Sequence, residues 1–372
     1  MDFSGLIGEI SRGISGFTAG NAVMIAAGLI LVFLAVVKEY EPVLLLPIGF
    51  GCILANLGMS NEHGLFKILY DAGIKTELFP LLIFIGVGAM IDFSPLLSQP
   101  KMVLLGAAGQ FGIYATLLLA ILLGFPLKQA ASIGVIGAID GPTAIFVATK
   151  LAPELLAPIA VAAYSYMSLI PIIQPPIMRL MTSRRERLVR MEYSPRPVSQ
   201  KVRVVFPIVV TIFVSLLAPD AAPLIATLML GNLLRECGVV DRLSKSAQNE
   251  IINTATLFLG LAIGSTMTAS SFLNWQTGLV LILGLLAFVI DTVAGLLFGK
   301  LMCWLSGYTI NPLIGACGIS AFPMAARLTA KMAQEEDFEN FILMHAMGSN
   351  TAGQLGSVIA GGLLLALVMA FH

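Results

Sequence analysis

Asp140 is the residue whose type and surroundings most clearly suggest chemistry. It lies in the motif GAIDGPTAIF (137–146), inside an apolar run long enough to enter a membrane. A carboxylate at the centre of a bilayer costs roughly 3 kcal/mol, so such an acid is normally retained for an ion or proton pathway. Thr143 adds a hydroxyl and the Gly141-Pro142 backbone leaves carbonyls free, an oxygen-only set suited to a hard cation such as Na⁺. Asp140 would also serve as the N-cap of a helix starting near Pro142, and the two roles can coexist.

A second segment rich in glycine and proline, NPLIGACGISAFPMAAR (311–327), matches the first but has Cys317 at the position of Asp140. It offers Asn311 and Ser320 instead. If the two segments meet, one negative charge and several neutral oxygens would hold one Na⁺ without a large net charge in the lipid. The alternative for Asn311 and Ser320 is helix capping and hydrogen bonding between helices.

Tyr166 lies in the proline-rich run YSYMSLIPIIQPPIM, whose prolines must release backbone carbonyls. We predict a role for Tyr166 in the site, although tyrosine more commonly anchors a helix at the membrane interface. The corresponding stretch near the C-terminus, MGSNTAGQLGS (347–357), is loosened in a similar way and carries Asn350, Thr351 and Ser357.

Arg327 ends the second segment, and Lys150 is its counterpart at the end of the first. The guanidinium fork of an arginine suits recognition of a carboxylate entering from the cytoplasm. The alternative is a side chain that merely reaches the lipid headgroups.

Asp291, in GLLAFVIDTVAGLLF, is the other deeply placed acid, and it has no counterpart in the first half of the chain. A second cation or proton role and a structural hydrogen bond to a neighbouring helix are equally open for it. His345 lies near Arg327 in sequence and suits either packing or the lining of a site.

These residues are distributed over twelve apolar runs, six on either side of one polar stretch. The runs are 20–37, 43–59, 78–97, 102–124, 130–149, 155–181, 203–217, 222–235, 254–273, 278–299, 309–326 and 338–371. The polar stretch is rich in arginine and is predicted to be cytoplasmic by the positive-inside rule. We therefore predict an amphipathic N-terminal segment (1–19), a first repeat (20–181), a basic linker (182–203) and a second repeat (204–372).

The two halves align at an almost constant offset of 176 to 178 residues. Pro47 and Asn56 correspond to Pro223 and Asn232, and further matches continue through the later runs. Small and apolar residues match easily by chance, but a steady register across five segments does not arise that way. The sequence therefore predicts an internal repeat.

The fifth run of each half is too interrupted by glycine, proline and polar residues to be an ordinary span. We call these runs the first broken segment (130–149) and the second broken segment (309–326) and predict that each is a re-entrant hairpin. Five spans and one hairpin give an odd number of crossings, so the halves must be inverted, with a site where the broken segments meet. The expected fold is an all-α polytopic membrane protein with about ten spans, two broken hairpins and both termini outside.

Composition excludes several other classes of protein. Of the 372 residues, 58% are hydrophobic and 11% are charged, which rules out a water-soluble fold. The net charge is zero and no basic stripe crosses the apolar runs, so nucleic acid is not an expected partner. The four cysteines are widely separated and suggest neither a zinc site nor a disulfide framework.

At GAIDGPTAIF, YSYMSLIPIIQPPIM and NPLIGACGISAFPMAAR the sequence resembles the beta subunit of the sodium-pumping biotin-dependent decarboxylases, which act on oxaloacetate, methylmalonyl-CoA, glutaconyl-CoA or malonate. The resemblance includes YEPVLLLPIGFG (40–51) and LMHAMGSN (343–350), and so runs nearly end to end. The first motif usually reads GGADGPTAIF in that family, which makes Ile139 a departure beside the acid.

The resemblance implies a membrane subunit that receives carboxybiotin, releases CO₂, exports Na⁺ and consumes an external proton. It implies a biotin carrier subunit that supplies the biotin, a carboxyltransferase subunit, a small single-span membrane subunit, a homo-oligomer and a bacterial or archaeal inner membrane. The family's functional residues fall on Asp140, Tyr166, Asn311, Gly315, Ser320 and Arg327.

We expect Na⁺ at Asp140, Thr143, Asn311 and Ser320, carboxybiotin near Arg327 and Gly315, and catalysis by Asp140, Tyr166 and Arg327. The rival hypothesis is a secondary transporter of the same design, which exchanges Na⁺ for H⁺ or moves an organic anion without catalysis.

Overall fold

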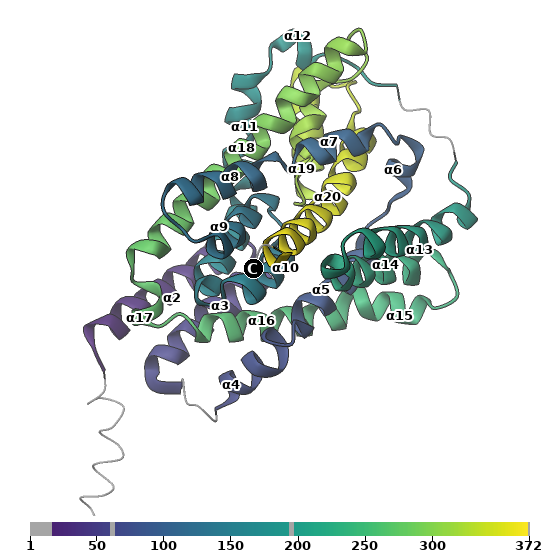
Figure 1. Ribbon diagram of the computed structural model, residues 1–372. Coiled ribbons are helices and arrows are strands. Elements are labelled where there is room, and N and C mark those ends of the chain that lie inside the picture. The colour runs from purple at the N-terminus through teal and green to yellow at the C-terminus, as the bar shows by residue number, and fades with distance from the viewer. Residues whose placement is uncertain (1–16, 60–63, 193–196, 371–372) are drawn as a thin grey trace, which may run out of the picture.

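The computed structural model describes residues 17–59, 64–192 and 197–370, and this part of the chain is helical without strands (Figure 1). Most of the amphipathic segment predicted at 1–19 lies outside the described residues. The helices of the first half are α2 (Ala19–Val37), α3 (Pro42–Leu54), α4 (Leu65–Leu69), α5 (Leu78–Met90), α6 (Ser94–Ser98), α7 (Met102–Ala108), α8 (Phe111–Leu122), α9 (Leu127–Gly134), α10 (Gly141–Leu151), α11 (Leu156–Met181) and α12 (Arg184–Arg187). Those of the second half are α13 (Gln200–Leu217), α14 (Ala222–Glu236), α15 (Asp241–Ser246), α16 (Ile252–Ser265), α17 (Ala269–Phe272), α18 (Trp275–Leu305), α19 (Met324–Glu336) and α20 (Leu343–Ala370).

Seven short π or 3₁₀ elements connect or extend these helices. They are η1 (Ala55–Met59), η2 (Tyr70–Ile74), η3 (Val135–Ala138), η4 (Pro153–Leu155), η5 (Pro219–Ala221), η6 (Ala247–Ile251) and η7 (Pro312–Cys317). Two of them, η3 and η7, lie inside the broken segments, where the sequence predicts interrupted helix.

Within the described residues, six helical stretches are long and apolar enough to cross a membrane, and two bent helix pairs raise the number to eight. The six are Ala19–Val37, Pro42–Met59, Met102–Leu122, Gln200–Leu217, Trp275–Leu305 and Leu343–Ala370. The prediction of an all-helical, multi-span membrane protein is confirmed. The count falls below the predicted ten because other apolar helices, such as α14 with 15 residues and α16 with 14, are shorter than a full span.

Helices α2 and α13 lie at the periphery and carry exposed apolar side chains. Leu29, Ile30 and Phe33 of α2 and Phe213 and Leu216 of α13 are each at least half exposed. A continuous apolar surface of this kind is typical of contact with lipid.

The two halves pack against each other through two equivalent helix pairs, α3 with α16 and α5 with α14. In each pair, one asparagine forms a hydrogen bond to the end of the partner helix. Asn56 Nδ2 donates to Met267 O just beyond α16 at 2.8 Å, and Asn232 Nδ2 donates to Ile91 O just beyond α5 at 3.0 Å. Both amides therefore satisfy carbonyls that the end of the partner helix leaves without an intrahelical donor.

The basic linker is held against the junction between α19 and α20 by ion pairs. Arg187 Nε lies 2.7 Å from Glu336 Oε1, and Arg190 Nε lies 2.6 Å from Asp337 Oδ2. The hydrogen bonds and charge of Arg190 hold the pKa of Asp337 below its usual range. Since Asp337 therefore stays ionised at neutral pH, this contact of the linker is present throughout the physiological range and is lost only in acid.

Candidate functional site

The first broken segment breaks between η3 and α10, beside the acid. Ile139 has φ +53° and ψ +40°, the left-handed region that a β-branched residue rarely adopts. Asp140 follows with an extended backbone and is the N-cap residue of α10. Its carboxylate thus lies at the positive end of the α10 dipole, which favours negative charge there.

The second broken segment consists of η7, an irregular stretch from Gly318 to Pro323, and the start of α19. It meets the first at its irregular stretch, where the backbone N–H of Ser320 donates to Ala138 O at 3.3 Å. Ile139 and Ile319 belong to one small apolar cluster that also includes Phe288 of α18. The two broken segments are therefore in direct contact.

Three neutral donors converge on a single oxygen of Asp140. Thr143 Oγ1 donates to Oδ2 at 2.7 Å, Ser357 Oγ at 2.9 Å and Gln354 Nε2 at 3.0 Å. The Asp140 side chain is only 5% exposed, and no Lys, Arg or His forms an ion pair with it among the described residues. Asp140 is therefore a buried acid held by hydroxyl and amide groups alone.

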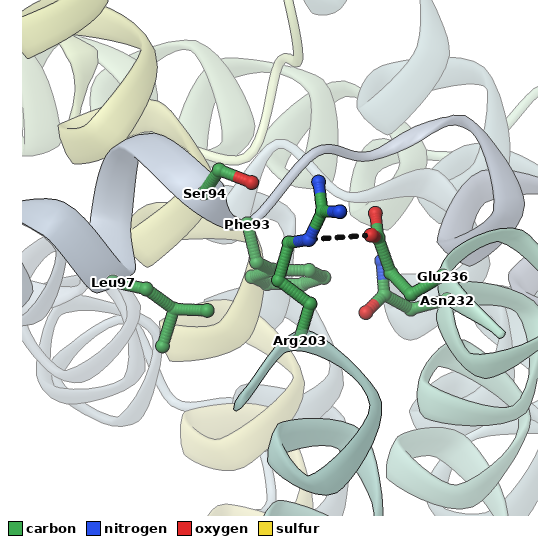
Figure 2. A pocket seen from close by; sticks show the side chains of 6 residues that line it. All are labelled: Phe93, Ser94, Leu97, Arg203, Asn232 and Glu236. Atoms are coloured by element: carbon green, nitrogen blue, oxygen red, sulfur yellow. Dashed lines mark ion pairs between the residues drawn. The ribbon is translucent and has the colours of Figure 1, made fainter. Parts of the chain in front are cut away.

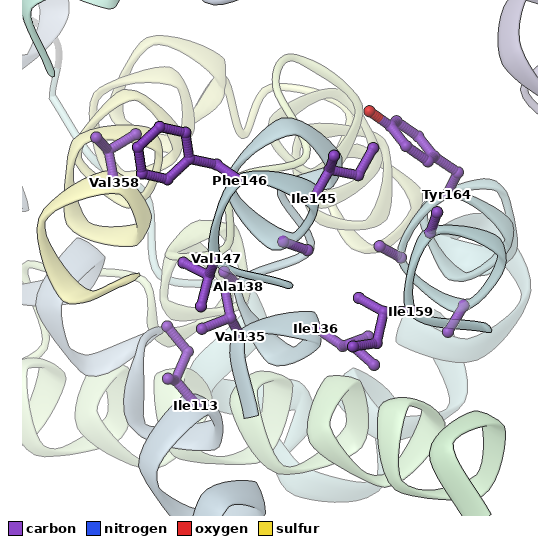
Figure 3. Close-up of a cluster of buried hydrophobic side chains, with 14 of the residues drawn as sticks. Ile113, Val135, Ile136, Ala138, Ile145, Phe146, Val147, Ile159, Tyr164 and Val358 are labelled. Carbon is purple, nitrogen blue, oxygen red and sulfur yellow. The ribbon is translucent and has the colours of Figure 1, made fainter. Parts of the chain in front are cut away.

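The elements on either side of Asp140 belong to the apolar core (Figure 3). One cluster of buried side chains joins four elements: Val135, Ile136 and Ala138 from η3, Ile145, Phe146 and Val147 from α10, Ile159 and Tyr164 from α11, and Val358 from α20. In such surroundings a carboxylate strongly prefers a bound cation or proton. Two hydroxyl oxygens, a carboxylate and a side-chain amide are the ligand types that suit a hard cation, so the residues present fit Na⁺.

A junction of glycines and one glutamine fixes the backbone next to Ser320. Gln110, between α7 and α8, donates through Nε2 to Gly318 O at 3.0 Å and to Gly353 O at 3.2 Å. A Cβ built on Gly109 would lie 2.2 Å from Gly318 O, and one on Gly353 would lie 2.4 Å from the same atom. The backbones of three elements therefore touch at Gly318.

Two further buried amides bind the carbonyls on either side of Gly318. Gln174 Nε2 of α11 donates to Ala316 O at 2.9 Å, and Asn350 Nδ2 of α20 donates to Ile319 O at 2.7 Å. These bonds satisfy carbonyls that an interrupted helix cannot pair with its own N–H groups. The amides thus stabilise the break in the membrane interior.

Of the residues predicted to bind Na⁺, Thr143 is bonded directly to Asp140, and Ser320 lies at the neighbouring contact of the broken segments. Ser320 Oγ donates to Gly353 O of α20 at 3.2 Å, one residue before Gln354 and four before Ser357, which both bind Asp140. Sequence reasoning noted Ser357 without assigning it a role and missed Gln354. Asn350, Gln354 and Ser357 are spaced at i, i+4 and i+7, and that common helix face is the signal that could have found them.

Asn311 is not part of this group, contrary to the prediction. Its Nδ2 donates to Arg187 O at 3.0 Å and to Val189 O at 2.8 Å, and its Oδ1 accepts from Leu313 N. The side chain caps η7 and holds the linker, so its hydrogen-bonding groups are used away from Asp140. This is the capping role that the sequence left as the alternative.

Asn311→Ala is expected to loosen the linker without weakening ion binding. It removes two hydrogen bonds to linker carbonyls, each worth about 1 kcal/mol. Trypsin should therefore cut the variant faster than wild type after the linker arginines between Arg184 and Arg190. The Na⁺ KM should stay within twofold of wild type. Asn249→Ala, which removes an exposed amide that binds Lys245 O, is the matched control. A tenfold rise in the Na⁺ KM would instead return Asn311 to the ion site.

Gly315 lies against α18 rather than at the acid. A Cβ built on Gly315 would lie 2.0 Å from Gly295 O, and one on Gly295 would lie 2.2 Å from Gly315 O. The close contact of its backbone is therefore with α18, and the position of carboxybiotin near Gly315 stays a prediction.

Tyr166 joins α11 to α18. Its half-buried hydroxyl donates to Leu281 O, and its ring packs on Gly284. A different tyrosine, Tyr164, lies beside the acid, because a Cβ built on Gly141 would lie 2.6 Å from the Tyr164 hydroxyl. The sequence did not predict a role for Tyr164. Tyr166 therefore positions helices, and Tyr164 covers the loop that carries Asp140.

Tyr166→Phe is expected to lower the turnover of the assembled complex by about three- to tenfold, because one hydrogen bond between α11 and α18, worth about 1 kcal/mol, is lost. The Na⁺ KM should change little, since the hydroxyl does not bind Asp140. Tyr114→Phe, on the more exposed surface of α8, is the control and should behave as wild type. A Na⁺ KM that rises in step with the loss of turnover would contradict the positioning role.

Arg327 lies on α19 with its side chain exposed. Among the described residues it forms no ion pair, whereas its counterpart Lys150 pairs with Glu77 at 3.0 Å. Lys331, one turn further along α19, is also exposed. Arg327 is therefore available to an anionic group that reaches this surface.

A small cavity lies away from Asp140, where α13, α14 and the α5–α6 connection meet (Figure 2). It has no room for a water molecule, and Arg203 Nε lies 3.3 Å from Glu236 Oε2 beside it. Arg235 also pairs with Glu236, at 3.5 Å. These paired charges join helices and do not form a binding site.

Comparison with known proteins places the chain in a family. A family model described as the Na⁺-transporting oxaloacetate decarboxylase beta subunit matches residues 20–368. The chain is 54% identical to the methylmalonyl-CoA decarboxylase subunit beta of Veillonella parvula over 96% of its own length and 95% of the relative's. It is 54% identical to the glutaconyl-CoA decarboxylase subunit beta of Acidaminococcus fermentans, with the same coverage, and 45% identical to the oxaloacetate decarboxylase beta chain of Klebsiella pneumoniae, over 96% and 97%. With its two touching broken segments and its buried acid, the chain belongs to the beta-subunit family of the Na⁺-transporting decarboxylases.

Proposed function

We propose that this chain is the membrane subunit of a decarboxylase sodium pump, which decarboxylates carboxybiotin delivered by a partner and uses the reaction to export Na⁺. The observation that carries the proposal is Asp140, a buried acid at the contact of two broken segments whose bonds all come from neutral groups. An acid that serves only the fold would not need to be placed where two helices are interrupted.

The relatives support the choice of carboxybiotin as the substrate. Their names specify three different acyl substrates, yet they share 45% to 54% identity with this chain. A reaction on the acyl substrate would differ from one relative to the next, so it is not the reaction that these similar membrane subunits share. Decarboxylation of a common carrier, after the acyl substrate has been consumed elsewhere, is the step that they can share.

Asp140 is proposed to bind Na⁺ together with Thr143, Ser357 and Ser320. In the structure, the two hydroxyls and Gln354 donate to the carboxylate. With Na⁺ present, the hydroxyls can rotate and offer their lone pairs to the ion. The site therefore replaces hydrogen bonds with ion contacts without moving the backbone. A proton on Asp140 would release Na⁺, because a buried carboxylate prefers either partner to none.

Arg327 is proposed to receive the carboxylate of carboxybiotin, since its exposed guanidinium matches that group. Loss of CO₂ breaks the N–C bond of carboxybiotin, and the ring nitrogen that keeps the electron pair takes up a proton. Tyr166 and Gly315 hold α18 against α11 and the second broken segment, and so keep the reacting region in place. The proposed partners are a biotin carrier subunit, a carboxyltransferase subunit, a small single-span subunit and further copies of this chain.

The two halves are proposed to be inverted repeats of about ten spans and two hairpins in an inner membrane. The reciprocal packing of α3 on α16 and α5 on α14 supports this arrangement, because a two-fold relation between the halves produces such paired contacts. The linker would then be cytoplasmic and both termini outside.

The proposed function is tested with the purified complex in proteoliposomes. Free carboxybiotin should release CO₂ in the presence of Na⁺, and radioactive Na⁺ should accumulate only while decarboxylation proceeds. A streptavidin blot should detect a biotinylated subunit in the complex. Na⁺ transport that continues without carboxybiotin, with no biotinylated partner, would favour a secondary transporter instead.

A further inference from the structure

Asp291 is a second buried acid, which the proposed mechanism does not use. It lies in the middle of α18, and its side chain is fully buried. Oδ1 accepts a hydrogen bond from the backbone N–H of Gly112, near the start of α8. Oδ2 is buried and has no hydrogen-bond partner. One carboxyl oxygen is therefore left without any donor in the membrane interior.

The unpartnered oxygen faces the first broken segment. A Cβ built on Gly137 of η3 would lie 3.0 Å from Oδ2, and one built on Gly112 would lie 2.5 Å from Oδ1. The carboxyl thus lies between two glycine backbones, with Ala287 one turn earlier on its own helix against both of them. No side chain on either glycine could share this space with the acid.

These contacts decide which partner the carboxyl can have. The groups that α8 and η3 present to it are glycine backbone, and no ion pair among the described residues involves Asp291. A metal cation needs several oxygens at coordination distance, whereas the polar group that binds this carboxyl among the described residues is the N–H of Gly112. An ionised carboxylate without a counter-ion is far more costly to bury than a neutral carboxyl group.

We propose that Asp291 is a proton-binding site whose Oδ2 carries a proton in this conformation. The carboxylate and one proton combine to form the neutral acid, and loss of the proton regenerates the carboxylate. Because both oxygens lie against backbone, ionisation requires η3 to separate from α18 so that water or a cation can reach Oδ2.

This site is connected to Asp140 through η3. Gly137 lies against Asp291 on one side, and three residues later Asp140 is bonded to Gln354 and Ser357 of α20 on the other. A movement of η3 away from α18 would therefore also displace Asp140. The proton on Asp291 and the Na⁺ on Asp140 are coupled in this way, and this second part of the inference rests on the proposed function.

Infrared difference spectroscopy of the intact complex tests the proton directly, without requiring decarboxylation. Asp291→Asn retains an oxygen to accept from Gly112 N and replaces the hydroxyl with an amide. The difference from wild type should show the loss of one protonated-carboxyl C=O band and of no carboxylate band. Thr292→Val, which alters the adjacent buried hydroxyl, is the control and should leave the carboxyl bands unchanged. Asp291→Cys gives the same comparison if the asparagine variant does not assemble.

Loss of a carboxylate band in place of the protonated band would overturn the proposal. The coupling is tested in the same instrument by adding Na⁺. The Asp291 band should shift in wild type and remain fixed in Asp140→Asn. A band that never shifts with Na⁺ would leave the proton site standing and overturn the coupling, whatever the outcome of the decarboxylation assay.

Discussion

Asp140→Asn is expected to raise the Na⁺ KM of carboxybiotin decarboxylation at least 100-fold, which corresponds to about 2.7 kcal/mol of lost binding. The substitution keeps the size of the side chain and its place before α10, so the fold is retained. It removes the only charge that attracts a cation among the groups that surround the site. Neutral oxygens alone bind a hard cation weakly, because its affinity depends strongly on the charge of its ligands.

Ser357→Ala is the matched comparison for Asp140→Asn. It removes one of three donors to the same carboxylate and leaves the charge in place, so the Na⁺ KM should rise only about three- to tenfold. Size-exclusion chromatography and recovery on streptavidin show whether each variant assembles. If assembled Asp140→Asn keeps the Na⁺ dependence of wild type, Asp140 does not bind the ion.

The contact between the two broken segments could be predicted from the sequence because its signal is local. Asp140 and Thr143 lie within four residues of each other, and glycine and proline in apolar runs mark the interruptions around them and around Ser320. The ring of amides could not be predicted in the same way. Gln110 is a single polar residue in an apolar run, and Gln354 is one of several polar residues in the last run, so the tertiary packing decides which of them turns toward a break.

Asn311 shows a second limit of the sequence. An asparagine before a proline suits both an ion site and a helix cap, and the residue types alone do not distinguish the two roles. The outcome depends on the linker, which comes from more than 120 residues earlier and brings the carbonyls of Arg187 and Val189 to it.

The contacts between helices also differ from the alignment of the two halves that the sequence suggests. Gly51 of α3 approaches Leu261 and Gly264, while Gly231 of α14 approaches Ile85 and Ala89. If the halves are the proposed repeats, these contacts pair Gly231 with Gly51, about one helical turn beyond the register that pairs Pro47 with Pro223. Residues four apart share a helix face, so a sequence comparison of small and apolar residues does not detect such a shift.

The second large effect is expected from Gly318→Ala, which should reduce Na⁺-stimulated decarboxylation by at least tenfold and lower the Tm of the complex. Gly318 has φ −66°, which alanine adopts freely, so the backbone conformation is not the obstacle. The obstacle is space, because a Cβ would lie 2.3 Å from Leu105 O. Overpacking against backbone cannot be relieved by a rotamer change and costs about 1–3 kcal/mol or more.

The loss of activity follows from the position of Gly318 in the junction with Gln110 and Gly353. Ser320 lies two residues further on, and its N–H binds Ala138 O of the first broken segment, so displacement of Gly318 separates the two parts of the proposed ion site. Gly278→Ala is the matched control, since a Cβ on Gly278 meets no atom within 4 Å and should slightly stabilise α18. If both alanine variants show the same Tm and activity, contact between the broken segments at Gly318 is not what assembles the site.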